Sequence, residues 1–232
     1  HTLVLVDEAT PPPNRYPVRA IGWQTLLTAS DSRQPPRVID VDMAAILYTS
    51  GSTGKPKGVV LSHRNMLTGA QSVVEYLNNR PDDRILAVLP FSFDYGLSQL
   101  TTAFTAGACA VLMDYLLPRD VIATVVRENI TGLAAVPPMW VQLAQLDWPA
   151  AAVASLRYIT NSGGAMPRAT LAALRRRLPN TTPFLMYGLT EAFRSTYLPP
   201  EEIDRRPDSI GNAIPRADIP AVRADGTPCA PG

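Results

Sequence analysis

Residues 44–60 read AAILYTSGSTGKPKGVV, an apolar run that passes directly into a loop of glycines, hydroxyl side chains and two lysines. Gly51, Gly54 and Gly58 allow backbone N–H groups to turn toward an anion, and a lysine adds positive charge. An ordinary surface turn needs only one or two residues of this kind. The segment therefore predicts a phosphate-binding loop that follows a β-strand.

A Walker-type P-loop is the closest alternative for this segment. That motif consists of Gly, four residues and then Gly-Lys-Ser/Thr. Here Pro56 follows Gly54 and Lys55, and Thr49 occupies the position where the first glycine of the motif would stand. Kinase-like and GTPase-like chemistry is therefore disfavoured.

The remainder of the chain alternates short apolar runs with segments of helical period, which indicates an α/β fold built on a mainly parallel sheet. The expected strands are residues 44–48, 84–89, 108–113, 132–136, 156–160 and 184–187, and the expected helices are residues 63–78, 95–105, 119–128, 138–146 and 168–178. Ser62 is expected to cap the first of these helices and Gly107 to end the second. Before the loop we expect a strand at residues 2–6 and a helix at residues 20–28.

The amino-acid composition restricts the classes of partner that the protein is expected to bind. The 232 residues contain 21 Lys and Arg against 20 Asp and Glu, so nothing suggests binding to nucleic acid or to a membrane surface. Cys109 and Cys229 stand far apart, so we expect idle or buried thiols rather than a disulfide framework or a zinc site. No signal peptide and no apolar run of membrane-spanning length is present in the sequence, which favours a cytoplasmic protein.

Two further motifs follow expected strands, at residues 161–167 (NSGGAMP) and 186–191 (MYGLTE). Ligands of parallel sheets usually bind at the carboxyl ends of the strands, so both motifs stand at positions suited to binding. Taken singly, the first motif is typical of a βα turn. The second is compatible with a helix start that has Glu191 in its first turn.

With the three motifs in this order, the chain resembles the adenylate-forming (AMP-binding) superfamily of acyl-CoA synthetases, nonribosomal peptide adenylation domains and luciferases. The resemblance implies that residues 1–232 form part of the large N-terminal domain of such an enzyme, without its C-terminal lid domain. Residues 187–215 resemble most closely the acyl-AMP ligases associated with bacterial exosortase loci.

The resemblance also implies roles for individual residues around ATP and Mg²⁺. Lys57 would be the cation of the phosphate loop, Tyr187 would stack on adenine, Thr190 would bind the α-phosphate and Glu191 would bind Mg²⁺. Lys57, Thr190 and Glu191 are thus the expected catalytic residues. The implied nucleotide-binding set is Thr49, Ser50, Gly51, Ser52, Thr53, Gly54, Lys57, Gly163, Gly164, Ala165, Tyr187, Gly188 and Thr190. Relatives often have Asn or Gln two residues before the tyrosine, whereas this chain has Leu185.

Residues 89–97 (LPFSFDYGL) resemble the family's aromatic gate between the nucleotide and acyl pockets. The resemblance assigns Phe93 to the gate and Gly164 to the acyl side. Asp94 has two possible roles: it could pair with the α-ammonium of an amino-acid substrate, or it could be a helix N-cap before Tyr95. The carboxylate substrate is accordingly either an amino acid or a plain acyl chain.

The function implied by the resemblance is ATP-dependent activation of a carboxylate to give acyl-AMP and pyrophosphate. Transfer of the acyl group to CoA or to the phosphopantetheine thiol of a carrier protein would follow. Two alternatives remain, a non-catalytic ATP- or AMP-binding module and a phosphotransferase that releases ADP. The family's later motifs, including a C-terminal lysine, are absent from the sequence. We therefore expect residues 1–232 alone to turn over poorly.

Overall fold

The computed structural model describes residues 2–5, 19–28, 37–50, 54–114 and 116–229. The chain divides into two compact units, residues 1–38 and 39–232. In the first unit, strand β1 (Thr2–Leu5) pairs in parallel with strand β2 (Arg19–Gly22), and helix α1 (Trp23–Thr28) follows at once. The predicted helix at residues 20–28 is therefore wrong at its start, because the first residues of that segment pair with β1 instead. Pairing with a partner strand overrides the local preference of so short a segment.

The second unit contains a seven-stranded sheet with the order β11-β10-β9-β8-β7-β5-β6. Five neighbouring strands run parallel: β5 (Arg84–Ala87), β6 (Cys109–Leu112), β7 (Gly132–Ala135), β8 (Tyr158–Asn161) and β9 (Thr182–Tyr187). Strands β10 (Thr196–Leu198) and β11 (Asn212–Ala213) extend the sheet in antiparallel fashion. The prediction of a mainly parallel sheet is confirmed, and the two antiparallel strands were not predicted.

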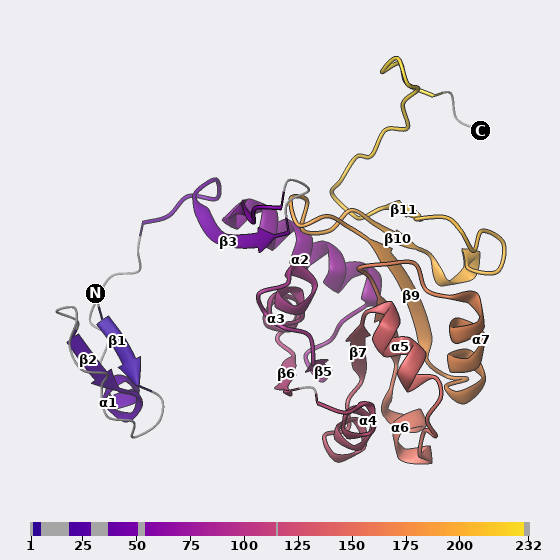
Figure 1. Cartoon of the computed structure of the whole chain (residues 1–232), viewed down its shortest axis with the longest axis horizontal. Helices are drawn as coiled ribbons and strands as arrows, with labels where there is room; N and C mark the ends of the chain where they lie inside the picture. Colours follow the sequence, from indigo (N-terminus) through magenta and orange to yellow (C-terminus); the bar gives the residue numbers. More distant parts are fainter. Residues whose placement is uncertain (1, 6–18, 29–36, 51–53, 115, 230–232) are drawn as a thin grey trace. The chain divides into compact units, whose positions relative to one another are not determined.

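Helices flank this sheet (Figure 1). They are α2 (His63–Leu77), α3 (Asp94–Ala106), α4 (Pro118–Arg127), α5 (Pro137–Leu143), α6 (Ala150–Ser155) and α7 (Arg168–Arg177). Ser62 caps α2 by accepting a hydrogen bond from the Asn65 backbone N–H at 3.2 Å, and Gly107 ends α3 with a φ of 67°. Both expected caps are thus confirmed. Tyr95 and Trp140 are among the largest fully buried side chains of the core.

The predicted phosphate loop joins two antiparallel strands, β3 (Met43–Thr49) and β4 (Lys57–Ser62), which form a separate two-stranded ribbon. The expectation that residues 44–48 belong to the parallel sheet is therefore wrong. Strand β4 was missed because its first residues, Lys57 and Gly58, belong to the phosphate-loop motif. Antiparallel strands need only a short connection, so the loop itself can close the ribbon. Ile46, Tyr48 and Val60 are exposed on the ribbon.

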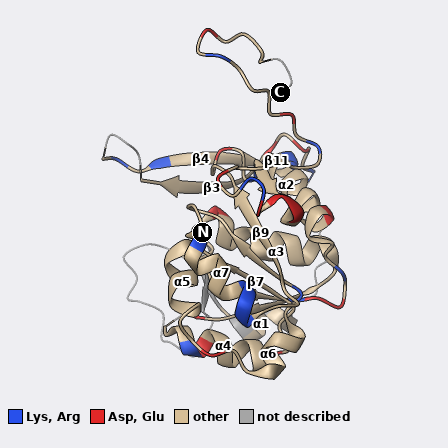
Figure 2. Cartoon of the chain, turned by 90° about the vertical axis from the view of Figure 1, so that its right-hand side faces the viewer, with Lys and Arg blue, Asp and Glu red and all other residues tan. Residues whose placement is uncertain are grey.

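Basic and acidic residues are interspersed over the described part of the chain (Figure 2), in keeping with its nearly neutral composition. Cys109 and Cys229 are free thiols, so the expectation of unpaired cysteines is confirmed, and because both are exposed the alternative of buried thiols is wrong. Among the described helices, none combines the length and the apolar character that crossing a membrane requires.

Candidate nucleotide and acyl site

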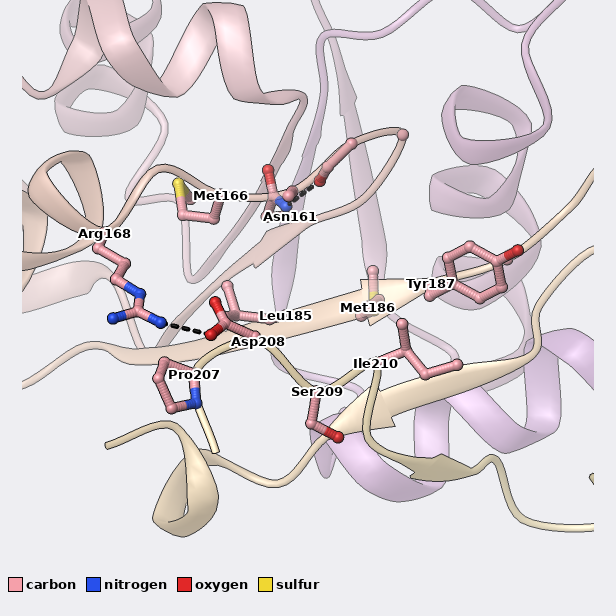
Figure 3. A pocket seen from close by; sticks show the side chains of 14 residues that line it. Asn161, Met166, Arg168, Leu185, Met186, Tyr187, Pro207, Asp208, Ser209 and Ile210 are labelled. Atoms are coloured by element: carbon pink, nitrogen blue, oxygen red, sulfur yellow. Dashed lines mark hydrogen bonds and ion pairs between the residues drawn. The ribbon is translucent and has the colours of Figure 1, made fainter. Parts of the chain in front are cut away.

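A cavity of about 670 Å³ lies at the carboxyl ends of β8 and β9 (Figure 3). The two strands are paired in parallel with Asn161 opposite Leu185, so the motifs that follow them emerge side by side. This volume lies within the usual range for small-molecule sites. Fourteen residues line the cavity: Asn161, Gly163, Gly164, Ala165, Met166, Arg168, Leu185, Met186, Tyr187, Gly188, Pro207, Asp208, Ser209 and Ile210.

The Gly-Gly segment turns sharply at the cavity wall. Gly163 has a φ of 78°, which is readily available to glycine but costly for a residue with a Cβ atom. The Asn161 side-chain amide donates a hydrogen bond to the Gly164 carbonyl at 2.9 Å and so holds the turn. Asn161 Oδ1 is buried and has no hydrogen-bond donor among the described residues, which leaves an acceptor available to a ligand. Asn161 was missed as a site residue because an Asn at a strand end reads as ordinary turn chemistry.

The opposite wall is formed by the end of β9. Tyr187 is exposed and is one of the residues that line the cavity, and Gly188 follows it. Leu185 also lines the cavity, so an apolar side chain stands where relatives often carry an amide. The structure thus brings together the predicted residues Gly163, Gly164, Ala165, Tyr187 and Gly188.

A third wall segment, residues 207–210, was not predicted. Arg168, which comes directly after the Gly-Gly motif, forms an ion pair with this segment. Its Nη2 lies 2.5 Å from Asp208 Oδ2 (Figure 3). Sequence reasoning missed this segment because it contains no residue pattern that suggests phosphate or metal binding. It reaches the cavity only because β10 and β11 bring the chain back past β9.

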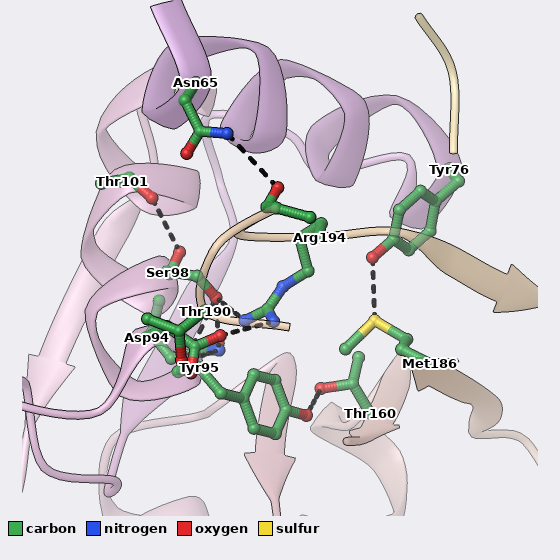
Figure 4. A network of polar contacts seen from close by, with 12 residues as sticks. Asn65, Tyr76, Asp94, Tyr95, Ser98, Thr101, Thr160, Met186, Thr190 and Arg194 are labelled. Atoms are coloured by element: carbon green, nitrogen blue, oxygen red, sulfur yellow. Dashed lines mark hydrogen bonds and ion pairs between the residues drawn. The ribbon is translucent and has the colours of Figure 1, made fainter. Parts of the chain in front are cut away.

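Near the cavity, Asp94 and Arg194 form a buried ion pair (Figure 4). Arg194 Nη1 donates to Asp94 Oδ2 at 3.3 Å, and Thr190 Oγ1 donates to Asp94 Oδ1 at 3.4 Å. Arg194 Nη2 donates to Ser98 Oγ at 2.7 Å. The side chains of Asp94 and Arg194 are only 7% and 2% exposed, so the pair is isolated from water.

Aromatic rings complete the surroundings of Arg194. Its guanidinium carbon lies 4.8 Å from the ring centroid of Tyr95 and 5.6 Å from that of Phe193, distances typical of cation–π contacts. Arg194 was not predicted as a site residue, because an arginine that follows a turn is usually solvated. The only signal in the sequence was its place three residues after Glu191.

The helix-cap role considered for Asp94 is wrong. Phe93 is the N-cap of α3 and makes no side-chain cap bond, while Asp94 is the first residue of the helix. The Phe93 ring is half-buried, and its Cζ lies about 3.5 Å from where a Cβ atom of Gly163 would be. Phe93 therefore lies next to Gly163 of the cavity wall, a position compatible with the gate expected between the nucleotide and acyl pockets.

Burial raises the pKa of the Tyr95 hydroxyl well above its usual range, and the hydrogen bond with Thr160 and the charge of Arg194 oppose that rise only in part. Tyr95 Oη and Thr160 Oγ1 lie 2.5 Å apart. The ring beneath Arg194 therefore stays neutral at physiological pH, and Asp94 supplies the negative charge of the cluster.

Among the described residues, the other predicted positions are not part of the cavity lining. Thr49 ends β3, Lys57 begins β4 directly opposite it, and Gly54 stands in the loop between them with a φ of 79°. Ser50 and Lys57 are exposed, and Gly51, Ser52 and Thr53 lie outside the described residues. Thr190 and Glu191 lie in a turn, so the alternative of a helix start there is wrong.

Known proteins resemble this chain over most of its length. An indoleacetate–CoA ligase from Aromatoleum aromaticum is 32% identical over 237 residues, which covers 100% of this chain and 44% of that protein. An L-proline–[L-prolyl-carrier protein] ligase from Streptomyces coelicolor is 36% identical over 198 residues, covering 81% of this chain and 37% of that protein. The chain thus spans less than half the length of either relative.

Among solved structures, an O-succinylbenzoate coenzyme A synthetase (MenE) from Bacillus subtilis, in complex with ATP and magnesium ion, superposes with a TM-score of 0.77 and 29% identity. The match covers 92% of this chain and 45% of that one. The sequence profile of the family described as AMP-binding enzyme matches residues 4–232. Since that match covers nearly the whole chain, the protein belongs to the AMP-binding enzyme family.

Proposed function

We propose that the full-length protein activates a small carboxylic acid with ATP to give an acyl-adenylate and pyrophosphate. The acyl group then passes to the thiol of CoA or of a carrier protein. The observation that supports the proposal is the cavity in which the two motifs expected to bind ligand meet at the carboxyl ends of β8 and β9. Family membership and the ligase relatives support the same reaction class.

The chemistry is an in-line displacement. A carboxylate oxygen of the acid attacks the α-phosphorus of ATP, and the bond from that phosphorus to the oxygen bridging to the β-phosphate breaks, so that pyrophosphate leaves. The protein itself takes little part in making and breaking bonds. It positions the two reactants and stabilises the charge that develops in the transition state. The Tyr187 ring and the Gly163–Ala165 turn both line the cavity, and an aromatic ring there could stack on a planar base.

Glu191 and Lys57 are the residues proposed to act on the phosphates. Glu191 is exposed, and its carboxylate has no hydrogen bond or ion pair within the described part of the chain, so it is free to bind a cation. One carboxylate together with substrate phosphates is a common ligand set for Mg²⁺, so the residues fit this ion. When bound, Mg²⁺ neutralises charge on the phosphates. Lys57, at the mouth of the β3–β4 loop, would add a second positive charge.

The Thr190 hydroxyl must rotate before it can donate a hydrogen bond to the α-phosphate. Its hydroxyl donates to Asp94 at 3.4 Å, a long and weak hydrogen bond. Rotation of the hydroxyl toward the nucleotide would exchange this bond for a charge-assisted one, which is the stronger of the two.

The test is exchange of labelled pyrophosphate into ATP by the full-length protein, dependent on an added acid and screened over fatty, aromatic and amino acids. We expect Lys57→Ala and Glu191→Ala each to lower the exchange rate at least about tenfold, as loss of transition-state charge stabilisation does. Lys55→Ala is the matched control for Lys57→Ala, since Lys55 is an exposed lysine of the same loop.

Two outcomes would contradict the proposal. ATP binding without exchange for any acid would indicate a non-catalytic module. Release of ADP instead of AMP would indicate transfer of the γ-phosphate. Equal effects of Lys55→Ala and Lys57→Ala would refute the specific role of Lys57.

A further inference from the structure

The cavity at the ends of β8 and β9 contains a buried polar atom that lacks a partner. Asn161 is only 2% exposed, and its Oδ1 receives no hydrogen bond within the described residues. Of the described side chains that line the cavity, no other has a nitrogen or oxygen atom that is both buried and unpaired. Because a buried acceptor without a donor is costly, the cavity favours a ligand that brings a donor to this atom.

The Gly-Gly turn fixes the orientation of the Asn161 amide. Its Nδ2 donates to the Gly164 carbonyl at 2.9 Å (Figure 3). A backbone carbonyl can only accept a hydrogen bond, so the reversed amide would place two oxygens against each other. Oδ1 is therefore held as an acceptor, and the amide cannot offer a donor to the ligand instead.

The strand register places Asn161 on the face of the sheet that forms the cavity. Asn161 of β8 pairs with Leu185 of β9, and Tyr187 stands two residues further along β9. Paired residues on neighbouring strands point to the same face of a sheet, and so do residues two apart on one strand. All three residues line the cavity. An acceptor, an apolar side chain and an aromatic ring thus share one face.

This face suits a flat aromatic ring that carries an N–H donor on its edge. The Tyr187 ring can stack on such a ligand, and the Leu185 side chain brings no polar atom. In the proposed reaction the flat ring is the adenine of ATP. Adenine carries an amino group, which donates, where guanine carries an oxygen, which accepts. An acceptor in the cavity therefore distinguishes purines by the group at position 6.

We propose that Asn161 is a specificity-determining residue whose Oδ1 accepts a hydrogen bond from the 6-amino group of the nucleotide base. The inference rests on the proposed use of ATP. It gives Asn161 a role beyond holding the Gly-Gly turn, namely the selection of 6-amino purines over purines that lack this group.

The first test needs no variant. Calorimetry in the presence of Mg²⁺ gives the dissociation constants of the full-length protein for ATP and for purine riboside triphosphate, which has hydrogen in place of the 6-amino group. We expect ATP to bind about tenfold more tightly, because only ATP satisfies the buried acceptor. Equal affinities would overturn the inference.

Two variants separate the acceptor from the turn. Asn161→Ala removes both the acceptor and the donor to Gly164, and we expect the ratio of the two dissociation constants to fall to about one. Asn161→Asp keeps an acceptor but loses the donor, so its ratio is expected to stay close to that of the wild type while both affinities fall. A folded Asn161→Ala protein that keeps the wild-type ratio would overturn the assignment, and so would an Asn161→Asp protein that loses it.

Leu185→Ala is the matched control, since Leu185 lines the same cavity and pairs with Asn161 but has no polar side-chain atom. We expect both affinities to change together and the ratio to stay as in the wild type. A ratio that falls as far as in Asn161→Ala would show that the shape of the cavity, rather than the acceptor, recognises the amino group. That result would also overturn the assignment.

Failure of the inference and failure of the proposed function give different results. Acid-dependent pyrophosphate exchange together with equal affinity for the two nucleotides overturns the inference and leaves adenylation in place. Nucleotide selection that depends on Asn161, without exchange for any acid, overturns adenylation and leaves the inference in place. Absence of ATP binding overturns both.

Discussion

Two Asp–Arg pairs with buried carboxylates lie at opposite ends of the same parallel sheet, and they are built differently. At the amino end, Asp83 stands just before β5. Its Oδ1 accepts hydrogen bonds from Arg157 at 2.9 Å and Thr131 at 2.7 Å, and its Oδ2 accepts from Arg157 at 2.5 Å, the Arg80 backbone N–H at 2.8 Å and Asn79 at 3.1 Å. Every bond is short enough to be well formed.

At the carboxyl end, the Asp94–Arg194 pair has fewer and longer bonds. Asp94 accepts at 3.3 and 3.4 Å, and Arg194 Nε has no acceptor within the described residues. Buried charges with incomplete hydrogen bonding stabilise a fold poorly, because desolvation offsets much of their attraction. The comparison indicates that the amino-end pair serves the fold, whereas the carboxyl-end pair is placed by the fold beside the ligand site.

The largest expected effect is that of Asp83→Ala. This substitution leaves Arg157 and three further donors without their acceptor, and removing one member of a buried pair costs about 4 kcal/mol of unfolding free energy. Urea unfolding measures the loss. Asp82→Ala is the control, since Asp82 is its exposed neighbour and should change the free energy by less than about 0.5 kcal/mol. A loss below about 1 kcal/mol for Asp83→Ala would contradict a structural role for this pair.

Asp94→Ala is expected to cost less, about 3 kcal/mol, because only two long hydrogen bonds are lost and Arg194 keeps its bond to Ser98 and its contacts with two aromatic rings. The same urea titration gives the value. A destabilisation equal to that of Asp83→Ala would show that the two pairs do not differ in the way their hydrogen bonds suggest.

A smaller effect should appear in the pH dependence of stability. Burial by itself raises the pKa of Asp83, but the hydrogen bonds from Arg157, Thr131, Arg80 and Asn79 outweigh it and hold the pKa below its ordinary value of 3.8. A carboxyl group whose pKa is lower in the folded than in the unfolded state stabilises the fold fully at pH values above its unfolded-state pKa. The stabilisation is lost as pH falls through the folded-state pKa.

Asp83→Asn is the variant that isolates this contribution. We expect the difference in unfolding free energy between wild type and Asp83→Asn to be constant from pH 7 to about pH 5 and to shrink below about pH 4. Urea titrations at several pH values provide the measurement. A difference that grows toward low pH would show that the pKa of Asp83 is raised rather than lowered.

Local pattern predicted much of this fold and part of the candidate site. The expected strands from residue 84 onward fall on β5 to β9, because each is a short apolar run bounded by turn residues. The Gly-Gly and Tyr-Gly motifs fall at the ends of β8 and β9, where they line one cavity. The exosortase-associated subgroup and the roles assigned to Lys57, Thr190 and Glu191 stay predictions.

The sequence by itself determined the family and the parallel strands, and it predicted a phosphate-binding loop, because these depend on residue types and spacings within short segments. Only the tertiary structure decided that β3 pairs with β4, that residues 207–210 form a cavity wall, and that Arg194 meets Asp94. Asp94 and Arg194 are 100 residues apart in sequence. Whether a buried carboxylate faces a substrate cation or an arginine of its own chain depends on such long-range packing, which no local pattern encodes.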